Sequence, residues 1–232
     1  KKLLESAKKP VIITNRRKCD NGKFDGNEKE RLAALKQAID LGADYIDIEI
    51  DADYSEITKN RKNSKIIISY HNFKETPENI DEIFNKLKSA NADIVKIATK
   101  ANKLSDNLKI IELVKNIKKP IIAICMGPLG EISRILAPIY GSFLTFASLK
   151  KDKESAPGQI PAETLKNIYR INDIKTKFKI YGIIGNPVSE SKGYIIHNAL
   201  FKEHKLNSIY LNFLVDDLDD FIKNFSSLSA GF

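Results

Sequence analysis

Short apolar runs alternate with helix-like segments along most of the chain, and this alternation constrains the fold more than any other feature. Six runs have the length of strands, at residues 10–16, 44–50, 65–71, 93–99, 120–126 and 143–149. Four intervening segments place apolar residues three and four positions apart, which predicts amphipathic helices over 27–42, 76–91, 104–117 and 130–141. Continuous apolar strands are typical of a parallel sheet covered by helices. The sequence therefore predicts an α/β fold.

The spacing of these units fits a (β/α)8 barrel, the TIM barrel. One strand and one helix recur about every 20 to 33 residues, as in such barrels. Residues 1–9 resemble the end of a helix, and residues 161–172 are expected to form the last barrel helix. We therefore expect a TIM barrel that lacks its first two strands, so that the six runs are strands 3 to 8. An open six-stranded sheet is the alternative.

A second α/β unit is expected after residues 173–178, where the pattern changes. It contains strands and helices in alternation, at 178–187, 193–204, 208–215 and 216–227, and a further strand is expected to begin at 229–232. The expected domains are a partial barrel over 1–173 and a partial α/β domain over 178–232.

The composition favours a soluble globular protein of the cell interior. The 232 residues are 42% hydrophobic, and no apolar run approaches the length of a membrane span. Residues 1–9 lack the apolar core of a secretory signal. We therefore expect no membrane partner and a location in the cytosol or in a plastid.

The charge and the cysteines exclude other classes of function. The net charge of +8 comes from 38 basic and 30 acidic residues, but the lysines are scattered, and no arginine-rich helix or aromatic RNA-binding motif accompanies them. Nucleic acid is therefore not an expected partner. Cys19 and Cys125 are far apart, no CxxC is present, and only three histidines are available as ligands. We expect reduced thiols, no disulfide and no metal site.

Lys96 lies inside the apolar run DIVKIAT at 93–99. A lysine in the middle of a strand loses hydration, which favours its neutral form, and a neutral amine can attack a carbonyl. The alternative is an edge-strand lysine whose ammonium reaches water. Other polar residues at the strand ends favour the chemical interpretation.

In a barrel the reacting groups lie at the carboxyl ends of the strands. The residues that fall there in this sequence are Arg16, His71, Lys96, Arg134, Ser155 and Gln159. Together they offer a nucleophile for a carbonyl, a proton carrier, two cations that can bind an anionic group, and two side chains that can bind hydroxyl groups.

Four motifs together resemble type I 3-dehydroquinate dehydratase. They are SYHNFKETP (69–77), DIVKIAT (93–99), MGPLGEISRILAPIYGSFLTFASL (126–149) and SAPGQI (155–160), and the resemblance covers nearly all of residues 10–172. It implies a TIM barrel and the dehydration of 3-dehydroquinate to 3-dehydroshikimate, in the shikimate pathway of aromatic amino acid biosynthesis. It also implies a lyase that uses neither a metal nor an organic cofactor.

The resemblance assigns a role to each candidate residue. Lys96 would form an imine with the substrate ketone, which acidifies the neighbouring carbon, and His71 would remove that proton and return one to the departing hydroxyl. Arg134 would hold the substrate carboxylate with its planar guanidinium. The remaining substrate-binding residues would be Arg16, Ser155 and Gln159.

Two features depart from the family pattern. A glutamate that orients the catalytic histidine usually follows the strand arginine by four residues, and Asp20 stands there instead, one methylene shorter. Asp20 is the expected orienting residue, with Glu49 as a substitute. The family's substrate-binding acid and arginine on the early strands would lie upstream of this sequence.

Residues 178–232 resemble the beginning of shikimate dehydrogenase, through YGIIGNPVSESKGYIIHNALF (181–201) and the segment 208–232. The order of the two parts resembles the plant-type bifunctional enzyme. Ser191 would bind the substrate, and Gly193 replaces a second serine, which leaves quinate open beside shikimate. The catalytic and NADP-binding parts of that family come later, so we expect NADP to serve the parent protein and no dehydrogenase activity in these residues alone.

Two other functions stay open at this point. One is another Schiff-base lyase or aldolase on a TIM barrel, because a strand lysine alone fits that class. The other, from a different class, is an inactive, truncated fragment that retains the motifs. Oligomeric state is not set by the sequence.

Overall fold

Five of the six expected strands form one sheet in the order β1-β2-β3-β4-β5. The computed structural model describes residues 2–226 and 228–231. The strands are β1 (Ile12–Thr14), β2 (Tyr45–Glu49), β3 (Lys65–Asn72), β4 (Ile94–Lys100) and β5 (Ile121–Met126). β1 pairs with β2, and β2 with β3, in parallel. The expected α/β fold with a parallel sheet is confirmed in these pairs.

The sixth expected strand, 143–149, does not form. Only Ser148 makes an isolated parallel bridge, with Pro161. The side chains of Phe143 and Leu149 are 42% and 86% exposed, so this apolar run is not buried on both faces as a barrel strand would be. The expected last helix, 161–172, contains the single π-helical segment η3 (Thr164–Ile168).

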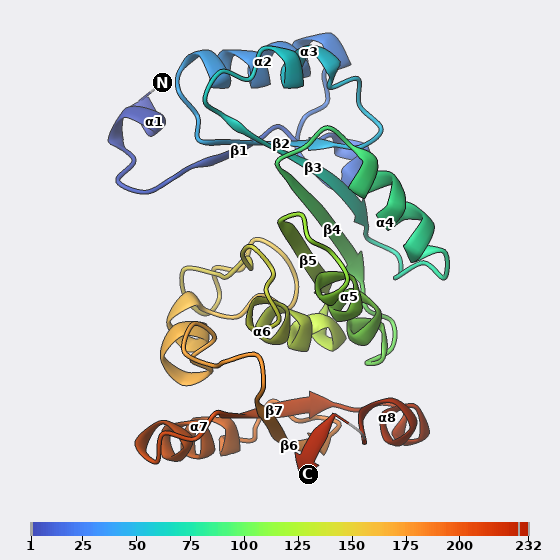
Figure 1. Cartoon of the computed structure of the whole chain (residues 1–232), viewed down its shortest axis with the longest axis vertical. Helices are drawn as coiled ribbons and strands as arrows, with labels where there is room; N and C mark the ends of the chain where they lie inside the picture. Colours follow the sequence, from blue (N-terminus) through green and yellow to red (C-terminus); the bar gives the residue numbers. More distant parts are fainter. Residues whose placement is uncertain (1, 227, 232) are drawn as a thin grey trace. The chain divides into compact units, whose positions relative to one another are not determined.

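The chain divides into two compact units. Unit 1 comprises residues 1–73, 79–98 and 118–122, and unit 2 comprises 74–78, 99–117 and 123–232. The helices of unit 1 are α1 (Lys2–Ser6), η1 (Lys18–Asp20), α2 (Glu28–Asp40), α3 (Ser55–Lys59) and α4 (Ile80–Ser89). α2 packs against α3, β1 and β2 (Figure 1).

Local sequence explains where α2 begins and ends. Asn27 caps its first turn by accepting a hydrogen bond from the backbone N–H of Glu30 at 2.9 Å, and the acids of that turn suit the positive end of the helix dipole. Gly42, at φ 85°, follows the helix in a conformation that favours glycine. α2 is thereby held at the position from which Arg31 reaches β2.

Unit 2 contains helices and a second sheet. Its helices are α5 (Asp106–Lys115), η2 (Pro128–Gly130), α6 (Glu131–Ile139), η3, α7 (Gly193–Glu203) and α8 (Leu218–Phe225). Its strands, in the order β7-β6-β8, are β6 (Lys179–Gly185), β7 (Ser208–Leu214) and β8 (Ser229–Gly231). α7 packs along β7 and also meets β6 (Figure 1). The strands and helices that the sequence predicts after residue 178 are therefore present, including the strand that begins at Ser229.

One apolar core of unit 2 contains side chains from both sides of residues 173–178, where the sequence pattern changes. Ile111 and Ile135, from α5 and α6, belong to the same buried cluster as Ile209, Phe213 and Phe221, from β7 and α8. Burial of each such side chain contributes roughly 1.5–3 kcal/mol relative to its exposure. Unit 2 is thus held together by apolar contacts across the point where the sequence pattern changes.

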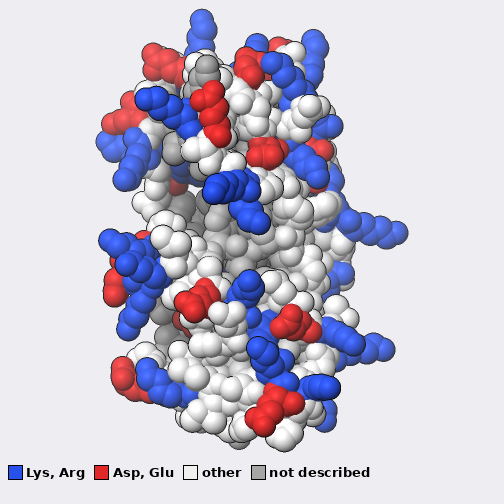
Figure 2. Space-filling view, turned by 90° about the vertical axis from the view of Figure 1, so that its left-hand side faces the viewer, with Lys and Arg blue, Asp and Glu red and all other residues white. Residues whose placement is uncertain are grey.

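Basic side chains do not gather in one patch on the face shown in Figure 2. Lys and Arg are spread over that face, with Asp and Glu among them. This distribution agrees with the scattered lysines of the sequence. Within the described ranges, no helix has both the length and the apolar character that crossing a membrane requires.

Strand β2 carries two acidic side chains on one face. Successive side chains of a strand point to opposite faces, so Ile46 and Ile48 lie on one side while Asp47 and Glu49 lie on the other. All four are buried. Two buried carboxylates on one face of a strand require cationic partners.

Candidate active site

Lys96 lies at the centre of a buried polar network in unit 1. It belongs to β4, which has β3 and β5 as its neighbours in the sheet, so it is not an edge-strand residue. Only 7% of its surface is exposed, and its Nζ lies 2.7 Å from Oδ2 of Asp47. The alternative of a lysine that reaches water from an edge strand is therefore wrong.

Asp47 joins three donors. Its Oδ2 accepts from Lys96, while its Oδ1 accepts from NH2 of Arg16 at 2.9 Å and from Oγ of Ser69 at 2.7 Å. Burial alone would raise the pKa of this carboxyl, but the charges of Lys96 and Arg16 and the hydrogen bonds hold it well below its usual range. Asp47 is therefore a fixed negative charge beside the amine.

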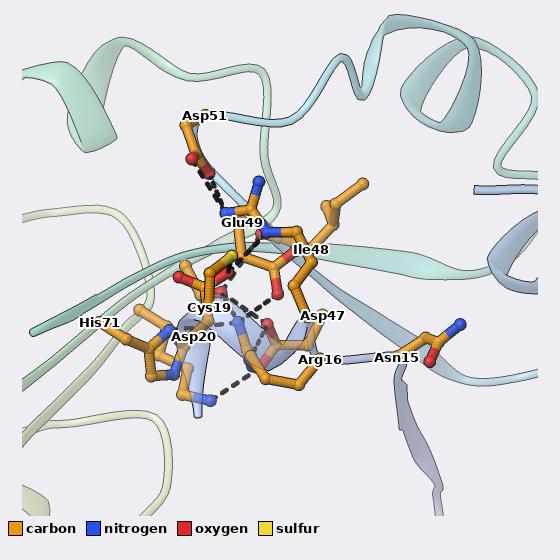
Figure 3. A network of polar contacts seen from close by, with 12 residues as sticks. Asn15, Arg16, Cys19, Asp20, Asp47, Ile48, Glu49, Asp51 and His71 are labelled. Atoms are coloured by element: carbon orange, nitrogen blue, oxygen red, sulfur yellow. Dashed lines mark hydrogen bonds and ion pairs between the residues drawn. The ribbon is translucent and has the colours of Figure 1, made fainter. Parts of the chain in front are cut away.

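Arg16 follows β1 and reaches across the same face of the sheet. Its NH1 lies 2.7 Å from Oε1 of Glu49, 3.2 Å from Oγ of Ser69 and 3.2 Å from Nδ1 of His71. The parallel register explains this meeting, because Glu49 pairs with Ser69 and His71 lies two residues further along β3 on the same face. Figure 3 shows Arg16 among Asp47, Glu49 and His71.

Arg31 supports the network from α2. It is 0% exposed, and its NH1 donates to Oε2 of Glu49 at 2.6 Å and to the backbone oxygen of Asn15 at 3.1 Å. Its Nε and NH2 donate to the carboxylate of Glu28 at 2.8 and 2.7 Å. Removing one partner of a buried ion pair costs about 3–5 kcal/mol in stability. Arg31 therefore holds Glu49 firmly in place.

His71 is partly buried on β3, and its ring stacks on Phe73 with centroids 5.9 Å apart. Burial, followed by the nearby cations Lys96 and Arg16, lowers the pKa of His71 to about 3, against the opposing charge of Asp47. The ring is therefore neutral near pH 7 in this state. A neutral imidazole can accept a proton, as a general base must.

This titration predicts how stability depends on pH. Between 6.5 and about 3 the unfolded chain binds a proton on His71 that the folded chain does not. The free energy of unfolding is therefore expected to fall as the pH drops through this window, by at most about 1.4 kcal/mol per pH unit. Urea unfolding at a series of pH values measures this, and His71→Asn should show a shallower dependence. An unchanged dependence in that variant would contradict the assignment.

Asp20, the expected orienting residue, is bound elsewhere. It ends η1, and its Oδ2 accepts from Nε of Arg17 at 2.6 Å, while NH2 of Arg17 donates to both carboxylate oxygens of Asp51 at 2.7 and 2.9 Å. Among the described contacts, the ring nitrogen of His71 meets Arg16 and not Asp20. In the described contacts, Arg16 lies between His71 and Glu49, the alternative orienting residue.

The remaining dehydratase candidates lie in unit 2. Arg134, on α6, is 2% exposed and donates to the backbone oxygens of Phe146 and Pro157 at 3.1 and 3.2 Å, and burial lowers its pKa to about 10. Ser155 and Gln159 bond to each other, with the backbone N–H of Ser155 donating to Oε1 of Gln159 at 2.8 Å and Nε2 of Gln159 donating to Oγ of Ser155 at 3.1 Å. The structure thus pairs Ser155 with Gln159 in one loop.

Gly158 shapes that loop. Its φ is 76°, and a Cβ at this position would lie 2.3 Å from the backbone oxygen of Gly127. Both the conformation and the close approach require glycine. The loop therefore has little freedom to place Gln159 elsewhere.

Ser191 lies in the turn before α7. Its Oγ accepts from the backbone N–H of Gly193 at 3.4 Å, and its backbone oxygen accepts from Nδ2 of Asn212 at 3.0 Å. A Cβ on Gly193 would lie 3.2 Å from the ring of Tyr210, which is tight for a serine there. Packing against Tyr210 is therefore a local reason for the glycine that replaces the usual serine.

Sequence reasoning missed Asp47, Ser69 and Arg31. Asp47 could have been found from the sequence, because DYIDIEI carries two acids at alternate positions of an apolar strand. Buried acids are rare unless they are paired. Arg31 left none, since it lies in a helix rich in charged residues. No group of His, Cys, Asp and Glu that could hold a metal ion occurs in the part of the chain that the structure describes.

Comparisons with known families cover both parts of the chain. Residues 1–176 match the type I 3-dehydroquinase family, and residues 183–232 match the shikimate dehydrogenase substrate binding domain. The chain is 38% identical over 239 residues to the chloroplastic bifunctional 3-dehydroquinate dehydratase/shikimate dehydrogenase of Arabidopsis thaliana, a match that covers 100% of this chain and 40% of the relative. It thus spans about two fifths of the length of that relative.

A single-function relative and two solved structures resemble the chain as well. The 3-dehydroquinate dehydratase of Methanocaldococcus jannaschii is 45% identical over 176 residues, which are 73% of this chain and 79% of the relative. The dehydroquinate dehydratase and shikimate dehydrogenase from S. pombe gives a TM-score of 0.63 at 26% identity, over 95% of this chain and 43% of that one. The 3-dehydroquinate dehydratase from Geobacillus kaustophilus gives 0.64 at 26% identity, over 70% and 67%.

Proposed function

The chain belongs to the type I 3-dehydroquinase family, and on that premise we propose that it dehydrates 3-dehydroquinate to 3-dehydroshikimate through an imine on Lys96. One observation carries the proposal: a buried amine in mid-sheet, 2.7 Å from a fixed carboxylate, on the same sheet face as a neutral histidine. An amine in this setting suits covalent catalysis on a ketone.

Asp47 gives the imine its electrostatic support. A protonated imine at Nζ carries the same positive charge as the ammonium that it replaces, at the same distance from Asp47. The carboxylate therefore favours the protonated imine over the neutral one, and the protonated imine is the better electron sink for a carbanion. Ser69 and Arg16 keep the carboxylate turned toward Nζ.

His71 then removes the proton next to the imine carbon and returns a proton to the departing hydroxyl. Its low pKa leaves the resting ring unprotonated and able to accept a proton, but it also makes the ring a weak base, because a catalytic base works best with a pKa near the operating pH. The second step needs an imidazolium, which the negative charge of a bound carboxylate would stabilise between Lys96 and Arg16. The carboxylate of the substrate would thus add a negative charge near His71.

Arg134, Ser155 and Gln159 are proposed to bind the carboxylate and the ring hydroxyls, with Arg16 as a further donor. Support comes from their residue types and from the fixed geometry of their loops. Arg134 is held by two backbone carbonyls, and Ser155 and Gln159 order each other. Preordered donors lose little freedom when a ligand binds.

The direct test is turnover of 3-dehydroquinate by the protein. We expect the loss of one water and the appearance of the conjugated enone, followed by its ultraviolet absorbance and by mass spectrometry. Aldol cleavage products instead would favour another Schiff-base lyase. A folded protein that turns over no 3-dehydroquinate would refute the proposal and leave the inactive fragment as the better interpretation.

For residues 178–232 we propose the beginning of a shikimate dehydrogenase substrate domain, preceded by the dehydratase over 1–173. The match to the shikimate dehydrogenase substrate binding domain and the place of Ser191 before α7 support it. NADP would serve the parent protein through a part other than these residues, because the sequence contains no GxGxxG. Whether shikimate or quinate binds is open. From the chloroplastic relative we propose a plastid or cytosolic location.

A further inference from the structure

Unit 2 contains a cavity of about 650 Å³. Its walls include residues of α6 and η3, which precede residues 173–178 in the chain, and residues of α7 and β7, which follow them. Several lining side chains are apolar, among them Leu104, Leu129 and Ile160. Small-molecule sites have volumes of roughly 300–1,000 Å³ and mostly apolar walls. The cavity therefore has the size and the character of a site for a small organic molecule.

One lining residue, Asn212 on β7, has a buried acceptor without a donor. Its Nδ2 donates to the backbone oxygens of Val188 and Ser191 at 3.2 and 3.0 Å. Both partners are carbonyls, so the amide cannot be turned round without losing both hydrogen bonds. Oδ1 of Asn212 is buried and has no hydrogen-bond partner in the structure. Because a buried acceptor without a donor is costly, Asn212 favours a ligand that donates a hydrogen bond.

Glu131, at the start of α6, lines the same cavity and is partly buried. Among the ion pairs of the described residues, none includes Glu131. Burial raises the pKa of Glu131, and the charge of Arg134 opposes this only in part. A cation beside the carboxylate would offset the loss of hydration. Glu131 thus favours a ligand with a positive charge.

Two lysines and two tyrosines add further chemistry to the lining. Lys151 and Lys192 are both exposed and can bind an anionic group at the cavity. Tyr169 and Tyr194 stack with ring centroids 5.5 Å apart and planes at 18°. Aromatic walls suit a flat apolar ring. The cavity therefore offers partners for a cation, an anion and an aromatic ring.

We propose that this cavity binds a free aromatic amino acid. The ammonium of the ligand binds Glu131 and Oδ1 of Asn212, its carboxylate binds the two lysines, and its ring packs on the two tyrosines. The cavity differs from the proposed substrate sites, because Ser191 is not among its lining residues. Gln159 does line it, but the amide of Gln159 is bonded to Ser155. The ring acids of the proposed function carry no ammonium and lack this match.

Tryptophan is a suitable probe because the 232 residues contain none. Its fluorescence, excited at a wavelength that tyrosine does not absorb, therefore reports the ligand alone. Titration of the full chain should give saturable binding with a rise in fluorescence anisotropy, and phenylalanine should compete. Tryptamine lacks the carboxylate and indole-3-propionate lacks the ammonium, so each should bind roughly tenfold more weakly than tryptophan.

Glu131→Gln tests the partner of the ammonium. This variant keeps the shape of the side chain and removes its charge, so it should weaken tryptophan binding roughly tenfold. It should also bring the affinities for tryptophan and indole-3-propionate closer together, which a merely structural role would not do. Glu190→Gln is the matched control, because Glu190 is exposed and is not among the lining residues. It should bind tryptophan as the wild type does.

The double variant Lys151→Met and Lys192→Met tests the partners of the carboxylate. It should weaken tryptophan binding roughly tenfold and leave tryptamine binding unchanged. Lys153→Met with Lys202→Met is the matched control. These two lysines are exposed and belong to the same two segments of the chain, but they are not among the lining residues. The control should keep the wild-type affinity.

Three results with the folded wild-type chain would overturn the inference. They are no saturable binding of tryptophan, equal binding of tryptophan and indole-3-propionate, and displacement of tryptophan by shikimate or 3-dehydroquinate, which would assign the cavity to a substrate. None of them depends on whether a variant folds. Turnover is not part of the measurement, so the outcome is independent of the proposed function.

Discussion

Replacing Lys96 with alanine should reduce dehydratase turnover to background, because the variant removes the amine on which we propose that the imine forms. The variant also removes one of the two cations that pair with the buried Asp47 and leaves Arg16 as the other, and the loss of one partner from such a pair costs up to about 3–5 kcal/mol in stability. Loss of activity through unfolding must therefore be separated from loss of the nucleophile. Steady-state kinetics and urea unfolding of the same preparation measure the two effects.

Lys96→Arg is the matched control. Arginine keeps a positive charge next to Asp47, but it stays protonated at any pH that the protein tolerates and cannot form an imine. We expect this variant to be folded and inactive. Turnover within a few-fold of the wild type in either variant would remove Lys96 from the mechanism.

Replacing His71 with alanine should separate imine formation from elimination. The imine should still form on Lys96, because the amine that attacks the ketone is retained, while elimination slows by roughly two to four orders of magnitude. Single-turnover kinetics measures the elimination rate, and mass spectrometry of the reduced adduct measures the imine. Asp20→Asn serves as a control. Because the carboxylate of Asp20 binds Arg17, this variant should keep most of the elimination rate.

Two outcomes would contradict this role. If His71→Ala forms no imine, His71 mainly positions the lysine or the substrate. If its elimination rate is within a few-fold of the wild type, His71 carries no essential proton.

Most of the sheet could be predicted from the sequence because β2 to β5 are rich in apolar residues, which are buried in the structure. The same rule failed at 143–149. Apolar periodicity counts residue types and not their burial, and Leu149 is 86% exposed. The rule therefore holds where both faces of a strand are covered and fails where they are not.

The site could be predicted in part. Lys96 and His71 are chemically conspicuous in strands, and both take part in one network in unit 1. The partner of Asp20 could not be predicted, because the spacing of residues along η1 does not say which neighbouring cation captures the carboxylate. Arg31 could not be predicted either, since its place at β2 depends on how α2 packs.

Borohydride trapping tests the imine on Lys96 most directly. The protein is incubated with 3-dehydroquinate and reduced, and its peptides are mapped by mass spectrometry. We expect one covalent adduct on the peptide that contains Lys96, and none in Lys96→Arg. Full turnover with Lys96 unmodified, or an adduct on a different lysine, would contradict it.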